Sequence, residues 1–161
     1  MTLSIRRARP GDSALIFALL CELAEYEKLT HELVATEADI AEALFQDNPV
    51  LFCEIAEWEN KPAGFAIWFF NFPTFAGRRG IYLEDLFVRP AFRGKGIGKA
   101  LLVYLAKLCV DNGWSRMQWS VLDWNTPSID FYKSLGAQMM DEWKLCKVTG
   151  AALSQLAKAK P

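Results

Sequence analysis

The chain has few of the histidine and cysteine residues that metal binding or thiol chemistry requires. It contains one histidine, His31, and four cysteines with no Cys-x-x-Cys pair among them: Cys21, Cys53, Cys109 and Cys146. A zinc site needs several such ligands at close spacing, and a cysteine nucleophile needs a base beside it. We therefore expect no metal ion and no covalent intermediate on cysteine. We interpret the cysteines as reduced and buried, and His31 as a surface residue.

Long apolar runs and an excess of charge are also absent. No stretch approaches the roughly 18 apolar residues that a membrane span needs, and the basic N-terminus is not followed by an apolar stretch of signal-peptide length. The net charge of -1 gives no general attraction to nucleic acid, and the basic clusters RRARP and GRR are short. We expect a cytoplasmic protein with no nucleic-acid or membrane partner.

The length and composition are those of one soluble domain. The chain has 161 residues, of which 52% are hydrophobic and 23% are charged, and it contains no internal repeat or linker-like tract. A chain of this size holds one core and leaves little room for a second. We therefore predict a single domain over residues 1–161.

Turn signals recur at intervals that suit alternating strands and helices, so we predict a mixed α/β (α+β) fold. Two strand-like segments, 50–58 and 63–72, are separated by ENKP, a hairpin signal that makes the first strands antiparallel. Apolar residues recur at helical spacing in 10–29 and in 36–45, which starts at Thr36. The other predicted strands are 3–8, 81–88, 115–122 and 142–149, and the other predicted helices are 98–113, 125–137 and 151–160.

A glycine-rich loop separates the strand 81–88 from the helix 98–113. Its sequence, RGKGIG over residues 93–98, has the spacing R-x-x-G-x-G. A strand, a glycine turn and a helix start present backbone N–H groups and the positive end of the helix dipole to one point, which suits a phosphate. Arg93 and Lys95 add positive charge there. The alternative is an ordinary turn with solvated basic side chains.

Two well-known nucleotide motifs do not fit this loop. The dinucleotide motif G-x-G-x-x-G fails because, counting from Gly94, Lys99 stands where the third glycine would be. The P-loop motif fails because Ala100, rather than serine or threonine, follows the Gly98-Lys99 pair. The loop is therefore expected to bind a diphosphate in another context.

At these residues the chain resembles the GNAT superfamily of N-acetyltransferases, and within it the diamine (spermidine/spermine) and thialysine acetyltransferases. The resemblance is carried by ELAEYEKL in the first helix, YLEDLFV before the loop, RGKGIG in the loop and LDWNTPSIDFYKSLGA near the C-terminus. It implies a GNAT fold: a central mixed, mostly antiparallel sheet that is splayed at the acetyl-CoA site, with flanking helices. It also implies a homodimer, and the aromatic stretch IWFFNFPTF is consistent with a covered surface.

The resemblance assigns acetyl-CoA, as co-substrate, to the loop and its surroundings. The diphosphate would be bound by the backbone between Arg93 and Lys99. The pantetheine arm would be bound by backbone groups of Leu86 and Val88, where the strand leaves its neighbour at a bulge. Residues that start the helix 125–137 match cofactor-contacting positions, with helix capping as their alternative role. The cofactor set is Leu86, Phe87, Val88, Arg93, Gly94, Lys95, Gly96, Ile97, Gly98, Lys99, Asn125, Thr126, Pro127, Ser128 and Tyr132.

Acetyl transfer to an amine requires a base and an acid. A primary amine with a pKa of about 10 arrives as an ammonium, and the departing thiolate takes up a proton. Glu84 lies in an apolar strand beside the loop and matches the family's glutamate base, which acts through water. Tyr132 faces inward on its helix and matches the family's acid. Their alternative roles are a salt bridge and a core aromatic ring. We predict direct attack in a ternary complex.

The acceptor amine is less well determined. The period-2 rule places Asp85 on the strand face opposite Glu84, where it supports the structure or contacts the cation. Polyamine-specific family members carry an acid and a tryptophan where this chain has Pro73, Thr74 and Phe75, so a thialysine-like or other small primary amine ranks before spermidine. The residues that match family substrate positions are Tyr26, Glu27, Glu84, Asp85, Gln118, Trp119, Ser120, Asp141 and Trp143.

A function of another class is also compatible with these motifs. The chain could bind an acyl-CoA as a sensor or regulatory module without useful catalysis, since a fold does not fix an activity. The presence of both Glu84 and Tyr132 favours the enzyme.

Overall fold

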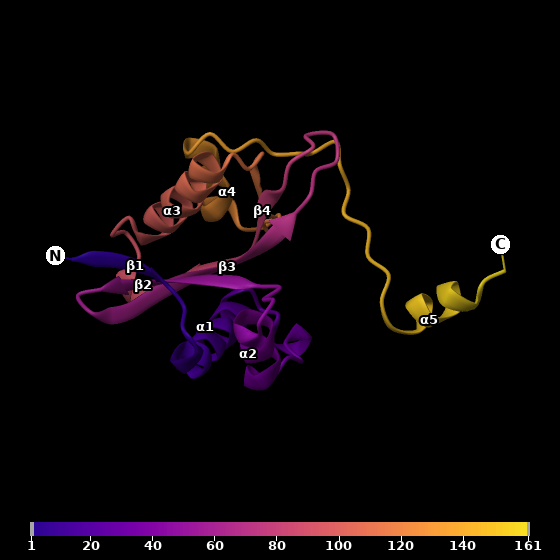
Figure 1. Ribbon diagram of the computed structural model, residues 1–161, viewed down its shortest axis with the longest axis horizontal. Helices are drawn as coiled ribbons and strands as arrows, with labels where there is room; N and C mark the ends of the chain where they lie inside the picture. Colours follow the sequence, from indigo (N-terminus) through magenta and orange to yellow (C-terminus); the bar gives the residue numbers. More distant parts are fainter. Residues whose placement is uncertain (1, 161) are drawn as a thin grey trace. The chain divides into compact units, whose positions relative to one another are not determined.

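The computed structural model describes residues 2–160 and contains a five-stranded sheet with helices on both faces (Figure 1). The strands lie side by side in chain order: β1 (Leu3–Arg7), β2 (Phe52–Trp58), β3 (Lys61–Asn71), β4 (Gly80–Val88) and β5 (Met117–Gln118). The pairs β1–β2, β2–β3 and β3–β4 are antiparallel, and β5 is parallel to β4. The predicted mixed α/β fold with a mostly antiparallel sheet is confirmed.

Two helices, α1 (Ser13–Tyr26) and α2 (Glu37–Phe45), lie on one face of the sheet, and α3 (Ile97–Asn112) lies on the other (Figure 1). Three short 3-10 helices connect these elements: η1 (Pro10–Asp12), η2 (Thr30–Glu32) and η3 (Pro90–Phe92). Thr36 caps α2, as predicted, by accepting a hydrogen bond from the Asp39 N–H at 3.2 Å. No helix in the described part of the chain is long and apolar enough to cross a membrane.

The core on the α1 side of the sheet joins helix and strand residues that are far apart in the chain. Its buried members are Ala8, Ile16, Leu19, Leu23, Leu44, Cys53, Ile55, Phe65, Ile67 and Phe87. On the other face, α3 packs on β3 and β4 and buries Leu101 and Leu105 completely. Burial of each large apolar side chain contributes about 1.5–3 kcal/mol, so several residues fix each helix layer to the sheet.

The predicted hairpin is formed by β2 and β3. Its two turn residues, Glu59 and Asn60, have positive φ values of 50° and 60°, and Trp58 pairs with Lys61 across the turn. A two-residue turn of this kind has a twist that matches the right-handed twist of antiparallel strands. The hairpin prediction is confirmed.

Residues 121–160 belong to a second compact unit, which contains α4 (Thr126–Ser134) and α5 (Gly150–Lys158). The predicted strand 142–149 is wrong, because this segment contains no strand and its large apolar side chains are exposed, Trp143 by 74% and Leu145 by 90%. The segment has the composition of a strand, but a strand forms only where a neighbour pairs with its backbone groups.

The predicted strand 115–122 is reduced to the two residues of β5. Met117 pairs with Ile81 and Gln118 pairs with Tyr82. The pairing between β4 and β5 ends at Gln118. The residues after it, 119–122, have no strand pairing with β4 and are therefore not part of a strand.

Candidate active site

The glycine-rich loop lies between η3 and the first turn of α3. Gly94 and Gly96 have φ values of 77° and 78°, in the left-handed region that glycine adopts without strain. The N–H of Ala100 donates to the carbonyl of Gly96 at 2.9 Å, so the amides of residues 97–99 precede the helical hydrogen-bond pattern. With the positive end of the helix dipole, these amides suit a phosphate group.

The side chain of Arg93, the arginine of the loop, packs against the end of α1. Its Nε donates to the Val88 carbonyl at 2.9 Å, and the Arg93 guanidinium lies 4.6 Å from the centre of the Tyr26 ring and 5.7 Å from that of Phe87. The ammonium of Lys95 lies 5.1 Å from the centre of the Trp58 ring. Both basic side chains of the loop therefore rest on aromatic rings, and that of Arg93 ties the loop to α1 and β4.

The strand that precedes the loop pairs with β5 over two residues only. Beyond Tyr82, no strand in residues 2–160 pairs with the β5-side edge of β4, whereas its other edge stays paired with β3 as far as Val88. Backbone groups of residues 84–88 on the β5 side are thus outside the sheet ladder. The early end of the β4–β5 pairing agrees with the splay predicted at this place. The Phe87 ring belongs to the core and its backbone pairs with Phe65 of β3, so neither faces the β5-side edge.

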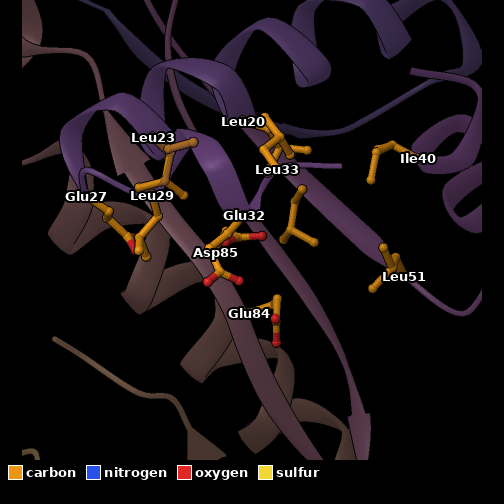
Figure 2. A pocket seen from close by; sticks show the side chains of 12 residues that line it. Leu20, Leu23, Glu27, Leu29, Glu32, Leu33, Ile40, Leu51, Glu84 and Asp85 are labelled. Atoms are coloured by element: carbon orange, nitrogen blue, oxygen red, sulfur yellow. The ribbon is translucent and has the colours of Figure 1, made fainter. Parts of the chain in front are cut away.

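A β-bulge in β4 places two adjacent carboxylates on one face of the sheet. Asp85 pairs with Ile67 and Leu83 pairs with Trp68, so Glu84 is the extra residue between two consecutive pairs. An extra residue shifts the alternation of side chains by one position. The prediction that Asp85 lies on the face opposite Glu84 is therefore wrong: both carboxylates line the same pocket (Figure 2).

This acidic pocket has a volume of about 380 Å³ and is built from α1, η2 and their surroundings over β3 and β4 (Figure 2). Its lining combines apolar side chains with four carboxylates: Leu20, Leu23, Ala24, Glu27, Leu29, Glu32, Leu33, Ile40, Leu51, Ile67, Glu84 and Asp85. None of these lining residues is basic. Apolar walls with several acids suit an organic cation, because an ammonium that loses its water needs a partner.

Burial changes the titration of two acids in the pocket. It raises the pKa of Asp85 to about 7, with further contributions from the charges of Glu84 and Glu27. Burial also raises the pKa of Glu27. The pocket therefore contains a carboxyl group that changes its charge near neutral pH, as proton transfer requires. Within residues 2–160, no group of three or more His, Cys, Asp or Glu residues is arranged to hold a metal ion.

Of the predicted substrate residues, Glu27, Glu84 and Asp85 meet in the acidic pocket. Tyr26 lines a neighbouring groove of about 370 Å³ instead, together with Glu22, Glu25, Phe87, Pro90 and Arg93. In and after β5, Gln118 and Ser120 are exposed, and the Ser120 hydroxyl lies 3.0 Å from that of Tyr82. Trp119 lies between them and is partly buried.

The other predicted site residues belong to the C-terminal unit. Asn125 caps α4 by accepting a hydrogen bond from the Ser128 N–H at 3.3 Å, which is the capping role foreseen as the alternative to cofactor contact. Thr126 and Pro127 form the first turn of α4, and Tyr132 is buried on the same helix. The remaining two, Asp141 and Trp143, are exposed in the segment that follows α4.

Sequence reasoning missed part of the pocket. Glu32 and Leu33 come from η2 and the residue after it, and Ile40 and Leu51 come from α2 and the approach to β2. A 3-10 helix of three residues leaves no periodic pattern that could be recognised. The only feature of the sequence that could have pointed to Glu32 as a pocket residue is that it is an acid near the end of the first helix.

Comparison with known proteins places this geometry in a family. Residues 16–137 match the model of the Acetyltransferase (GNAT) family. The chain is 37% identical to a thialysine N-epsilon-acetyltransferase of Bos taurus, with 95% of this chain and 96% of the relative covered. It is 34% identical to an L-ornithine N5-acetyltransferase of Arabidopsis thaliana, with 96% and 87% covered.

A solved structure gives the same result for the fold. An integron cassette protein from the mobile metagenome of V. cholerae superimposes with a TM-score of 0.82 at 29% identity, and 99% of each chain is covered. The family model spans the α1 core, the acidic pocket, the glycine loop and α4. The chain therefore belongs to the GNAT family of N-acetyltransferases.

Proposed function

We propose that this protein is an acetyl-CoA-dependent N-acetyltransferase that acetylates a primary amine of a small molecule. The acceptor would be a thialysine-like amino acid, a diamine or a polyamine. The observation that carries the proposal is the acidic pocket on β4, since the same strand leads directly into the glycine loop. The named activities of the thialysine and ornithine acetyltransferases, which are similar over nearly the whole chain, support an amine acceptor.

The residues present fit acetyl-CoA. The left-handed glycines Gly94 and Gly96 leave the loop without side chains at the places where the chain turns, and no atom lies within 4 Å of a Cβ built on either. Amides of residues 97–99 would hold the diphosphate. Backbone groups of Leu86 and the N–H of Val88, whose carbonyl accepts a hydrogen bond from Arg93, would hold the pantetheine arm. Asn125, Thr126, Pro127 and Ser128 are proposed as further contacts. When bound, acetyl-CoA supplies the acetyl thioester for the reaction.

The side chains of the pocket would prepare the amine for direct attack in a ternary complex. An ammonium bound among Glu27, Glu84 and Asp85 must lose one proton before its nitrogen can attack. Glu84 is exposed on the bulge, so it can pass a proton to water. Tyr132 is proposed as the acid that protonates the departing thiolate. No cysteine lines the pocket, which favours direct attack over an acetyl-enzyme intermediate.

A homodimer is part of the proposal. Large apolar side chains are exposed in the C-terminal unit, among them Trp143, Leu145, Leu153 and Leu156. An unpaired segment with such side chains is a surface that a second copy would cover. Sedimentation at micromolar concentration is expected to give twice the chain mass. A monomer at that concentration would remove the dimer from the proposal without affecting the activity.

The proposed activity is tested by binding and by initial rates. Calorimetric titration with acetyl-CoA is expected to give one site per chain, and thialysine, L-ornithine, putrescine and spermidine are then compared as acceptors. Acetylation of at least one of these amines supports the enzyme. Binding of acetyl-CoA without turnover of any amine would favour an acyl-CoA sensor, and absence of binding would overturn both functions.

A further inference from the structure

The bulge in β4 gives the pocket two carboxylates with different surroundings. Glu84 is the unpaired residue of the bulge and is exposed, whereas Asp85 is partly buried and pairs with Ile67, which is 1% exposed. Figure 2 shows both side chains among the residues that line the pocket. Asp85 is thus the deeper acid, and Glu84 is the one nearer to water.

No basic side chain among the lining residues neutralises Asp85. The titratable groups that line its pocket are Glu27 at the end of α1, Glu32 in η2 and Glu84 in β4, and all three are acids. Within residues 2–160, Asp85 also has no hydrogen bond or ion pair, in contrast to Asp12, which two arginine nitrogens reach at 2.8 and 2.9 Å. A carboxylate that is partly removed from water and has no cation beside it is unfavourable as an anion. Asp85 is therefore stabilised by binding either a proton or an ammonium group.

We propose that Asp85 is a further catalytic residue of the acetyl transfer, namely the group that first accepts the proton of the bound ammonium. The inference rests on the proposed function. In this step an N–H bond of the ammonium breaks and its proton passes to a carboxylate oxygen of Asp85. The nitrogen lone pair then attacks the acetyl carbon, the C–S bond breaks, and the thiolate takes up a proton from an acid, while the nitrogen releases its second proton to water, from which the acid is reprotonated. Asp85 returns its proton to solvent through Glu84 or water.

The titration of Asp85 agrees with this role. Burial, with the charges of Glu84 and Glu27, raises the pKa of Asp85 to about 7, close to the pH at which a general base is most effective. The arrival of an ammonium adds a positive charge beside Asp85 and ionises it, so the bound cation itself prepares the base. Glu84 has a separate task, because its exposure suits the exchange of protons with water.

The test compares Asp85→Asn, Glu84→Gln and the surface control Asp47→Asn. The acceptor is whichever amine of the panel named above the wild-type protein acetylates fastest. At neutral pH, Asp85→Asn is expected to lower kcat about 10²- to 10⁴-fold with the Kd for acetyl-CoA changed less than twofold. Glu84→Gln is expected to have a smaller effect, and Asp47→Asn none, since Asp47 is exposed and lies outside the pocket.

The pH profile separates proton transfer from simple attraction of the cation. In the wild type, kcat/KM is expected to rise with pH up to the pKa of Asp85 in the free enzyme and then to level off. In Asp85→Asn it is expected to rise continuously toward the pKa of the free amine, because only the neutral amine then reacts. If Asp85→Asn has the same pH dependence of kcat/KM as the wild type, or a raised KM with unchanged kcat, the proposal is overturned.

Two further measurements remove ambiguity. Circular dichroism establishes that each variant is folded, and Asp85→Glu, which keeps a carboxylate, is expected to regain part of the lost kcat. If the wild type binds acetyl-CoA but acetylates none of the amines, the proposed function fails and the role of Asp85 fails with it. If the wild type is active and Asp85→Asn retains its kcat, only the role of Asp85 fails.

Discussion

The guanidinium of Arg93 lies 4.6 Å from the centre of the Tyr26 ring, so the loop proposed to bind the diphosphate is attached to the end of the helix that borders the acidic pocket. The same side chain donates its Nε–H to the Val88 carbonyl. Its position, rather than its charge alone, thus connects the two halves of the site.

Replacement of Arg93 by lysine tests this connection. Lysine keeps the charge but loses the planar stack and the Nε–H donor to Val88. We expect Arg93→Lys to weaken acetyl-CoA binding about 3- to 10-fold, nearly as much as Arg93→Met does, since a cation–π contact and a hydrogen bond are each worth about 1 kcal/mol. Calorimetric titration gives both Kd values. An affinity of Arg93→Lys equal to that of the wild type would mean that charge alone matters.

Replacement of Gly96 by alanine tests the loop conformation. The φ of Gly96 is 78°, and a left-handed conformation costs a residue with a Cβ about 1–2 kcal/mol. We expect Gly96→Ala to lower the free energy of unfolding by about that amount and to weaken acetyl-CoA binding, measured by denaturant titration and calorimetry. Gly11→Ala is the matched control, because a Cβ at Gly11 meets no atom within 4 Å and Gly11 has no positive φ. Equal effects of the two changes would contradict the role of the loop conformation.

The stability of the protein should also depend on Asp85. The pKa of this group is raised from 3.8 in the unfolded chain to about 7 in the folded one, so the folded state binds more protons between these values. Stability due to Asp85 therefore falls as the pH rises from about 4 to 7. Asp85→Asn cannot ionise and is expected to be more stable than the wild type by about 1–3 kcal/mol at pH 8.

Thermal unfolding at pH 5 and pH 8 checks this expectation. The gain from Asp85→Asn should be smaller at pH 5, where the wild type has lost only part of the stability that it loses between about pH 4 and 7, and larger at pH 8. The surface change Asp47→Asn serves as the control at both values. A gain that is the same at pH 5 and pH 8 would mean that burial of the charge is not its cause.

A second buried acid offers an independent test on the other face of the sheet. Glu54 is fully buried; its Oε1 lies 2.8 Å from Arg7 Nη2 and accepts a hydrogen bond from Trp68 Nε1 at 3.3 Å. Arg7→Met leaves this carboxylate without its cation. We expect a loss of about 1–3 kcal/mol in the free energy of unfolding, less than for a fully buried pair because Arg7 is partly exposed.

Denaturant titration measures this loss, with Lys61→Met as a control, since Lys61 is exposed. Burial already raises the pKa of Glu54, and loss of Arg7 would raise it further. The loss should therefore be larger at pH 8 than at pH 5. Restoration of stability by the double change Arg7→Met with Glu54→Gln would identify the unpaired charge as the cause.

Much of the fold follows from local signals in the sequence. The Thr36 cap, the turn at Glu59–Asn60 and the glycine loop before α3 each have a chemical signature within a few residues, and the structure has all three where the sequence predicts them. Such signals are reliable because caps and positive φ values admit few residue types.

The features that sequence reasoning missed depend on partners that are distant in the chain. The bulge at Glu84 is defined by the register of β4 against β3, and nothing in YLEDLFV marks an extra residue. The segment 142–149 reads as a strand, but whether it becomes one depends on an available edge. Glu32 reaches the pocket through a short 3-10 helix that has no pattern of its own.

The extra residue in β4 also bears on how this site can change among descendants of the same ancestor. Leu83 and Phe87 lie on either side of the acid pair, and both are buried, on strand positions fixed by their pairing with Trp68 and Phe65. Because Leu83 and Asp85 pair with consecutive residues of β3, deletion of Glu84 would restore the regular alternation and leave Leu83 and Phe87 on their present faces. A relative with a single carboxylate here therefore needs no compensating changes beneath α1, so that the second acid can be gained or lost without repacking of the interior.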